Sequence, residues 1–110
     1  MKEFNSYQDI SENFTGICKV INSGAIYHMK DGKAHRENGP AIVNKNGSKF
    51  WCINGLEHRE DGPAVEYSDG IKQWWYKDIC YGHNYDDFTI ESWKEKVEQL
   101  KREEELKIFK

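Results

Sequence analysis

One seven-residue phrase occurs twice in this chain of 110 residues. Residues 35–41 read HRENGPA and residues 58–64 read HREDGPA, so the two copies are 23 residues apart. The same shift places Asn46-Gly47 on Asp69-Gly70. Self-similarity at a fixed period of this length indicates an array in which one supersecondary unit stacks on its neighbours. The copies of the unit span about residues 24–46, 47–69 and a degraded 70–88.

Each copy has the pattern of a β-hairpin followed by a connector. Short runs rich in β-branched and aromatic residues flank Asn46-Gly47. This dipeptide suits a tight hairpin, because both of its residues can take positive φ. Asp31-Gly32 and Asn54-Gly55 mark a second chain reversal. Since a lone hairpin is marginally stable in water, we expect successive hairpins to pair edge to edge.

The repeated heptad supplies the connector. Its Gly-Pro step turns the chain, and proline fits only at the start of a strand because it has no N–H to donate. In the structural interpretation the histidine caps a strand end and the arginine pairs with the glutamate. We favour this interpretation over ligand binding, because charged turn residues mostly serve as turn chemistry. The connectors place a ladder of side chains along one rim: His35/His58, Arg36/Arg59 and Glu37/Glu60.

The two ends of the chain are expected to cover the sheet of repeats, which spans 17–88 in a single domain of residues 1–110. Residues 89–110 are rich in helix formers and contain no glycine or proline. Thr89 is the candidate N-cap, and a capping box at Ser92 and Glu95 is the alternative. The N-terminal segment 1–16 has a weaker helical spacing that suggests a short helix. The apolar stripe of the C-terminal helix consists of Ile90, Trp93, Val97 and Leu100.

Both faces of the predicted sheet are aromatic, because side chains alternate across a strand. The sequence leaves open which face the helix covers. Two short end segments cannot cover a long twisted sheet, so some aromatic surface is expected to stay exposed, as in a protein interface. We favour a core position for Trp75 and Trp93. One face carries Tyr27, Met29, Phe50, Cys52 and Trp75, and the other carries Trp51, Ile53, Trp74 and Tyr76.

The spacing of Gly32 to His35 and of Gly55 to His58 resembles MORN-type repeats. It departs from them at Arg36 and Arg59, where the MORN pattern has glycine. A closer resemblance is to a variant with repeated GxxHRxDGPA, found in bacteriophage-encoded and other viral or microbial proteins. The resemblance implies an elongated, twisted antiparallel sheet that serves as a binding surface. It transfers no catalytic residues.

Composition excludes several classes of function. The net charge is −3, with no block of lysine and arginine, so binding to long nucleic acids gains no support. No apolar run suggests a signal peptide or a membrane helix.

Three cysteines without CxxC spacing predict reduced thiols in a cytoplasmic protein, in the host cytosol if the chain is viral. Nucleophile-elbow and phosphate-loop motifs are absent from the sequence, and the scattered histidines and cysteines predict no metal site or cofactor.

The sequence therefore predicts a mainly β (α+β) protein that is not an enzyme. We expect a protein-binding module, a viral accessory protein that docks on a host protein, such as a defence system, and modulates or inhibits it. The alternative is a binder of small nucleotides or single-stranded nucleic acid, which would use the His/Arg ladder and the aromatic rows. A homodimer through a sheet edge or the C-terminal helix is also open. The candidate partner-binding residues are Trp51, Trp74, Tyr76, Ile53, Arg36, Arg59, His35 and His58, and Leu106, Ile108 and Phe109 are candidates for self-association or partner contact.

Overall fold

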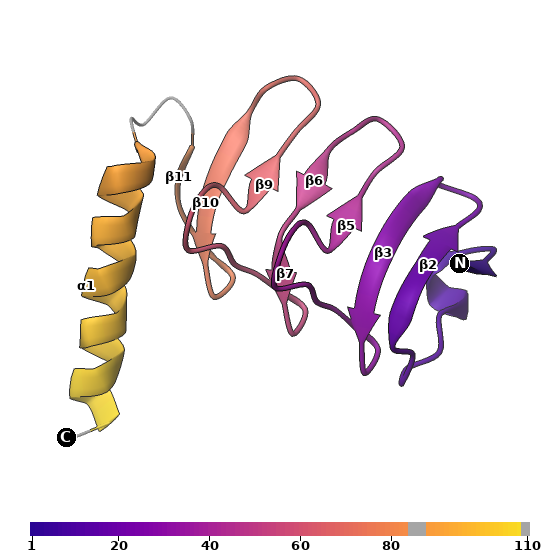
Figure 1. Cartoon of the computed structure of the whole chain (residues 1–110), viewed down its shortest axis with the longest axis horizontal. Helices are drawn as coiled ribbons and strands as arrows, with labels where there is room; N and C mark the ends of the chain where they lie inside the picture. The colour runs from indigo at the N-terminus through magenta and orange to yellow at the C-terminus, as the bar shows by residue number, and fades with distance from the viewer. Residues whose placement is uncertain (84–87, 109–110) are drawn as a thin grey trace.

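The computed structural model of the chain describes residues 1–83 and 88–108. The protein is mainly β with one C-terminal helix (Figure 1), which confirms the predicted α+β class. The elements in chain order are β1 (Lys2–Phe4), the 3-10 helix η1 (Tyr7–Asp9), β2 (Gly16–Val20), β3 (Ala25–Lys30), β4 (Lys33–Ala34), β5 (Ile42–Val43), β6 (Lys49–Phe50), β7 (Cys52–Ile53), β8 (Leu56–Glu57), β9 (Val65–Glu66), β10 (Lys72–Tyr76), β11 (Ile79–His83) and α1 (Ile90–Ile108).

Most strands join one open sheet in the order β1-β2-β3-β5-β6-β9-β10-β11, with β4 paired to β3. The short strands β7 and β8 pair with each other. Neighbouring strands run antiparallel except β1, which lies parallel to β2 through Lys2↔Cys18 and Phe4↔Val20. The strands of residues 16–83 therefore pair antiparallel, as expected for the repeats, and β1 of the N-terminal segment adds a parallel edge strand that makes the whole sheet mixed. No tight hairpin joins β1 to β2, so nothing local imposes antiparallel pairing on β1.

Two consecutive hairpins form the middle of the sheet. β5 pairs with β6 in the first hairpin, and β9 pairs with β10 in the second. The hairpins join edge to edge, as expected, through Lys49↔Glu66 and Phe50↔Val65. The molecule is elongated, with extents of 44 × 36 × 19 Å. Its radius of gyration is 15.4 Å, against about 13 Å for a compact chain of this length.

Two kinds of turn alternate along the sheet, and Figure 1 shows them at opposite ends of the strands. The first kind has two central residues with positive φ, which is the type I′ geometry that matches strand twist. The φ values are 50° and 76° at Asp31-Gly32, 50° and 81° at Asn54-Gly55, and 46° and 69° at Lys77-Asp78. The third pair has no glycine, so it adopts a left-handed conformation that is costly for L-residues.

The loop at Asn46-Gly47 belongs to the second kind and differs from the predicted tight turn. Within the pair, φ is positive at Gly47 alone, where it is 93°. Asn44 N donates to Ser48 O at 2.9 Å, so the loop contains three residues. Asn46 keeps an ordinary φ because its Oδ1 accepts a hydrogen bond from Ser48 N at 2.9 Å. The loop one period later has the same hydrogen bonds.

The N-terminal segment covers one end of the sheet. In the part of the chain where a short helix was predicted, the structure has strand β1 and the three-residue η1. Phe4 and Phe14 meet edge to face with ring centroids 5.4 Å apart. Together with Ile10 they pack on a buried cluster that draws on strands β2 to β7. The buried members of this cluster are Cys18, Met29, Ala34, Ala41 and Cys52.

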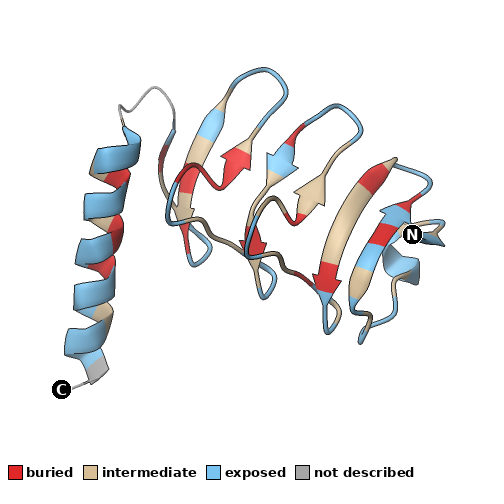
Figure 2. Ribbon diagram, in the orientation of Figure 1, coloured by how far each residue is buried: buried red, intermediate tan, exposed pale blue. Residues whose placement is uncertain are grey.

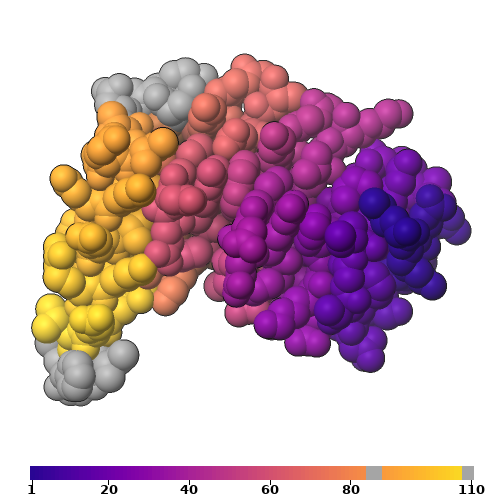
Figure 3. All heavy atoms as spheres, in the orientation of Figure 1, coloured from indigo at the N-terminus to yellow at the C-terminus, as the bar shows by residue number. Residues whose placement is uncertain are grey.

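Helix α1 covers the opposite end of the sheet (Figures 1 and 3). Thr89 Oγ1 accepts a hydrogen bond from Ser92 N at 3.0 Å, and Ser92 Oγ accepts one from Thr89 N at 2.9 Å. Thr89 is therefore the N-cap. The buried stripe of the helix (Figure 2) packs on strand β10, so α1 covers the face that carries Trp74 and Tyr76. The buried members of this second cluster are Trp74, Tyr76, Trp93, Val97 and Leu100.

Candidate functional site

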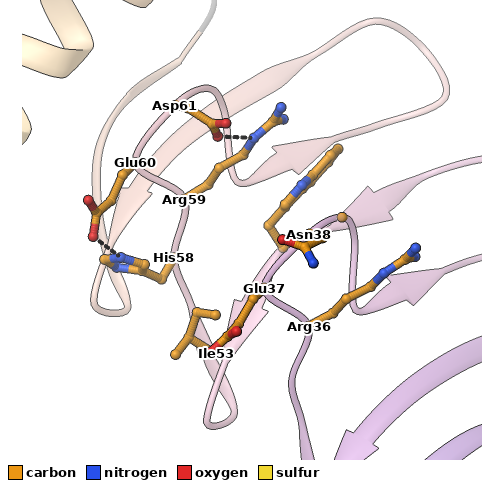
Figure 4. A pocket seen from close by; sticks show the side chains of 10 residues that line it. Arg36, Glu37, Asn38, Ile53, His58, Arg59, Glu60 and Asp61 are labelled. Carbon is orange, nitrogen blue, oxygen red and sulfur yellow. Dashed lines mark hydrogen bonds and ion pairs between the residues drawn. The ribbon is translucent and has the colours of Figure 1, made fainter.

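An open cleft of about 830 Å³ lies between the two covered ends of the sheet. Its walls are the connectors 36–39 and 58–61 (Figure 4), and Trp51 and Ile53 also line it. Both copies of the repeated heptad therefore contribute to one site. Among the described residues, none from the N-terminal segment or α1 lines this cleft. The cleft is thus the middle of the array, which neither end segment covers.

Arg59 is fixed in the cleft by contacts on all sides. Its guanidinium carbon lies 4.0 Å from the ring centroid of Trp51, a cation–π contact. Its Nε bonds Asp61 Oδ1 at 3.0 Å, and its Nη1 bonds Glu66 Oε2 at 3.0 Å. The same Nη1 donates to Pro63 O at 3.0 Å. The positive charge of Arg59 is therefore neutralised within the chain.

These contacts correct the predicted pairing of arginine with the glutamate of the heptad. Arg59 pairs with Asp61 and Glu66, and Glu60 pairs instead with His58 and with Lys101 of α1. Figure 4 shows why: Glu60 and Arg59 point in different directions from adjacent positions of an extended connector. Adjacent side chains on extended backbone face opposite ways, so partners lie two residues apart.

Arg36 occupies the equivalent position one copy earlier but has a different environment. Its Nη1 donates to Pro40 O at 3.3 Å, as Arg59 donates to its own proline. Asn38 and Val43 stand where the second copy has its two carboxylates. Within the described part of the chain, Arg36 has no ion-pair partner. Figure 4 shows the Arg36 and Arg59 side chains extending in the same direction.

The pKa of a neighbouring histidine responds to this unneutralised charge. His28 stands at the position of Trp51 one copy earlier, where it is half-buried. Burial lowers the pKa of His28 first, and the positive charge of Arg36 lowers it further. The histidine is therefore biased toward its neutral form, in which it does not repel the guanidinium.

The two heptad histidines cap the next turn along the sheet. Asn54 N donates to His35 Nδ1 at 2.9 Å, and Lys77 N donates to His58 Nδ1 at 2.9 Å. Each Nδ1 is therefore an acceptor and carries no proton in the folded protein. His58 Nε2 lies 3.2 Å from Glu60 Oε2. Both rings are held in place as structural caps, and of the two, His58 alone lines the cleft.

The structure separates the predicted row of exposed aromatic residues. Trp51 and Ile53 are half-buried and line the cleft. Trp74 and Tyr76 are only 5% and 4% exposed. Their rings lie beneath α1, which corrects the expectation that they form part of a contact surface. The ring of Trp93 packs against that of Trp74, with the centroids 5.7 Å apart and the ring planes tilted by 50°.

Of the C-terminal candidates, Leu106 does not line the cleft. Leu106 is 63% exposed near the end of α1. Phe109 and the side chain of Ile108 lie outside the described residues. Of the three, Leu106 is therefore the one whose exposure the structure describes.

Asp61, Glu66 and Asn38 contribute to the site but were not among the predicted partner-binding residues. The signal was present in the comparison of the two copies: Asp61 aligns with Asn38, and Glu66 aligns with Val43. These two differences, among several between the copies, fall around the same arginine.

Two buried thiols are poor candidates for chemistry. Burial raises the pKa of Cys52 to about 12, with smaller contributions from the charges of Glu57 and Asp78. Burial also raises the pKa of Cys18. A thiol is a nucleophile and a metal ligand only as the thiolate, which these surroundings disfavour. We therefore assign both to the core.

The described residues contain no group of three or more histidine, cysteine, aspartate or glutamate side chains that could hold a metal ion. Within the same residues, no helix has the length and apolar character needed to cross a membrane. Comparison with known proteins found no match: no family model, no curated protein and no solved structure matches this chain.

Proposed function

We propose that this chain is a non-enzymatic protein-binding module and that the cleft between the two connectors is its docking site. The observation that carries the proposal is the meeting of Trp51, Ile53 and Arg36 in one open cleft. Tryptophan and arginine dominate the energetics of protein interfaces, where they anchor a partner in a desolvated pocket. The surrounding polar connector residues supply the rim that such an interface needs.

The shape of the cleft favours a protein segment over an enclosed small molecule. Pockets for small ligands bury most of the ligand surface. This cleft instead opens to solvent along the connectors 36–39 and 58–61 (Figure 4). A loop or strand of a partner can lie across it and place one or two side chains against Trp51 and Ile53.

Two features support a binding role in preference to catalysis. The Nδ1 of His58 accepts a backbone hydrogen bond, so this atom is not free to accept a proton from a substrate. The thiol of Cys52 is buried and has a pKa of about 12, far from that of a reactive cysteine. A recognition surface needs neither an acid–base group nor a nucleophile.

The alternative of a nucleotide or single-stranded nucleic acid is less well supported by the charges. Glu37, Glu60 and Asp61 line the cleft beside the two arginines. Arg59 already has two carboxylate partners. A phosphate group carries up to two negative charges and would approach these carboxylates at short range. We therefore keep protein binding as the proposed function.

The resemblance to viral GxxHRxDGPA repeats extends the proposal to biology. We propose a viral accessory protein that acts in the host cytosol and modulates or inhibits a host protein. The support is the repeated heptad at residues 35–41 and 58–64.

Photo-crosslinking tests the docking site. Benzoylphenylalanine replaces Ile53 in the cleft or, as a control, Tyr67 in an exposed hairpin loop, and each protein is irradiated in host-cell lysate. We expect one defined adduct from position 53 and none of the same mass from position 67. Trp51→His should weaken the adduct without unfolding the protein, because the chain already carries histidine at the equivalent position 28.

Two outcomes contradict the proposal. Identical adduct patterns from positions 53 and 67 indicate contact without a docking site. An adduct of this chain with itself indicates self-association in place of a host partner. Circular dichroism of each variant establishes that the fold is kept.

A further inference from the structure

We propose that Arg36 is the anchor for a carboxylate of the partner, so that the cleft takes a protein segment with one aspartate or glutamate and an apolar residue beside it. This inference rests on the proposed function and names the chemistry of the partner. It is drawn from a comparison of two equivalent arginines within the same chain.

Arg59 shows how an arginine at this position is satisfied. Asp61 and Glu66 bind its guanidinium at 3.0 Å each. At the equivalent positions around Arg36 the chain has Asn38 and Val43, which carry no charge. The same backbone unit therefore builds two guanidinium sites and supplies carboxylates to one of them.

Arg36 is held ready for a ligand in the same way as Arg59. Each guanidinium lies against the glycine of its own connector: a Cβ added at Gly39 would lie 2.9 Å from Arg36 Cζ, and one at Gly62 would lie 2.8 Å from Arg59 Cζ. Each also donates to the carbonyl of the following proline. A side chain that is already fixed loses little conformational entropy when it binds a partner.

An unneutralised arginine in a half-buried position favours an anionic ligand. Arg36 is half-buried. Burial lowers the pKa of His28, and the positive charge of Arg36 lowers it further. The planar guanidinium presents paired N–H donors that match the two oxygens of a carboxylate. A ligand carboxylate would make here the bond that Asp61 makes to Arg59.

The rest of the cleft specifies what stands beside that carboxylate. Trp51 and Ile53 offer half-buried apolar surface next to Arg36. Glu37, Glu60 and Asp61 oppose a ligand with several negative charges. A single acidic residue with an aliphatic or aromatic neighbour satisfies both conditions.

A peptide titration followed by NMR tests the inference. The probes are acetyl-Leu-Glu-Leu-amide and, as the uncharged match, acetyl-Leu-Gln-Leu-amide. We expect millimolar binding of the glutamate peptide, with shifts at Arg36 Nε–H and the Trp51 indole N–H. The glutamine peptide should bind at least about tenfold more weakly, the factor that corresponds to the loss of one charge-assisted hydrogen bond.

Exchanging the environments of the two arginines provides matched variants. Asn38→Asp with Val43→Glu rebuilds around Arg36 the carboxylates that Arg59 has, and it should reduce glutamate-peptide binding at least tenfold. Asn38→Asp alone changes an exposed position and should also reduce glutamate-peptide binding, which keeps the test valid if the double variant folds poorly. Asp61→Asn with Glu66→Val should create a second response at Arg59.

Equal binding of the two peptides, or unchanged binding to the Asn38→Asp variants, overturns the inference. Stronger Arg36 shifts with adenosine monophosphate than with the peptide assign the cleft to phosphate and also overturn it. The position-53 crosslink separates this result from failure of the proposed function. If the position-53 adduct forms at full yield in the Asn38→Asp, Val43→Glu double variant, the docking site is retained and the carboxylate anchor is rejected.

Discussion

Gly32 and Gly55 occupy the same position in two type I′ turns but have different surroundings. Their φ values are 76° and 81°, so both need a residue that tolerates the left-handed region. A Cβ at Gly32 would lie 1.9 Å from the backbone oxygen of Glu12, whereas the nearest atom to a Cβ at Gly55 is Lys33 Cβ at 3.7 Å. Gly32 therefore also allows the N-terminal segment to pass over the turn.

The alanine variants of these two glycines should differ in stability. Gly55→Ala should lower the free energy of unfolding by about 1–2 kcal/mol, the cost of positive φ in an L-residue. Gly32→Ala should cost at least about 1 kcal/mol more, because the Glu12 backbone must also move. Urea denaturation of both variants measures the difference. Equal losses would show that the N-terminal segment yields without cost.

Sequence patterns predicted these turns unevenly, for reasons that lie in single residues. Asn54-Gly55 was predictable because glycine at the second position suits type I′ geometry. Lys77-Asp78 has the same positive φ values but no glycine, so its sequence does not signal a turn of this type. At Asn46-Gly47 the signal was real and the loop type was wrong, because the Asn46 side chain bonds Ser48 N.

Docking of α1 depends on contacts that the sequence pattern could not assign to a face. Trp93 Nε1 donates to Arg59 O at 2.9 Å, which fixes the first turns of the helix on the second connector. Further along, Lys101 pairs with Glu60, and Lys77 pairs with Glu104. Hydrophobic periodicity identified the buried stripe of the helix. The helix packs on the face that carries Trp74 and Tyr76. Both faces of the sheet are aromatic, so the periodicity of the helix does not select between them.

The docking of α1 should weaken in acid. Burial alone would raise the pKa of Glu60, but hydrogen bonds from Lys101 and His58 outweigh it and hold the pKa below its ordinary value of 4.5. A lowered folded-state pKa contributes stability that is complete above the ordinary value and is lost as the pH falls through the folded value. The melting temperature should therefore fall between about pH 5 and pH 3.

Glu60→Gln tests the origin of that pH dependence. The variant should melt a few degrees lower at neutral pH, since a partly exposed ion pair contributes about 0.2–1 kcal/mol. Its melting temperature should then fall less than that of the wild type on acidification. The pKa of Glu104 is also lowered, chiefly by its hydrogen bond with Lys77. Both proteins should therefore keep some acid sensitivity. If the melting temperatures of the two proteins fall in parallel as the pH is lowered, Glu60 is not the origin of the acid sensitivity.

At the scale of the whole molecule, the protein is a row of hairpins with a different cover at each end. The N-terminal cluster and the helix cluster share no buried residue. Strands β5 and β6 connect them through two-residue ladders to β3 and β9. In such an array each unit contacts mainly its neighbours, so stability is a sum of local and nearest-neighbour contributions.

This arrangement predicts that damage at one end stays near that end. Trp93→Phe removes the hydrogen bond to Arg59 O and should accelerate amide exchange in β9, β10, β11 and α1. Gly32→Ala should accelerate exchange in β2, β3 and the N-terminal segment. Hydrogen exchange read by mass spectrometry resolves these segments, because local opening and global unfolding differ in which amides they expose.

Amide exchange in the central strands β5 and β6 distinguishes independent opening of the two ends from unfolding as one cooperative domain. If the ends open independently, β5 and β6 should keep wild-type exchange rates in each single variant and lose protection only when both substitutions are combined. A fully cooperative domain would instead accelerate every segment by one common factor in either variant. The cleft depends on this difference, because its wall 36–39 joins β4 to the first central hairpin and its wall 58–61 joins the two central hairpins to each other. Independent opening would let a partner hold the middle of the array together while either end stays mobile.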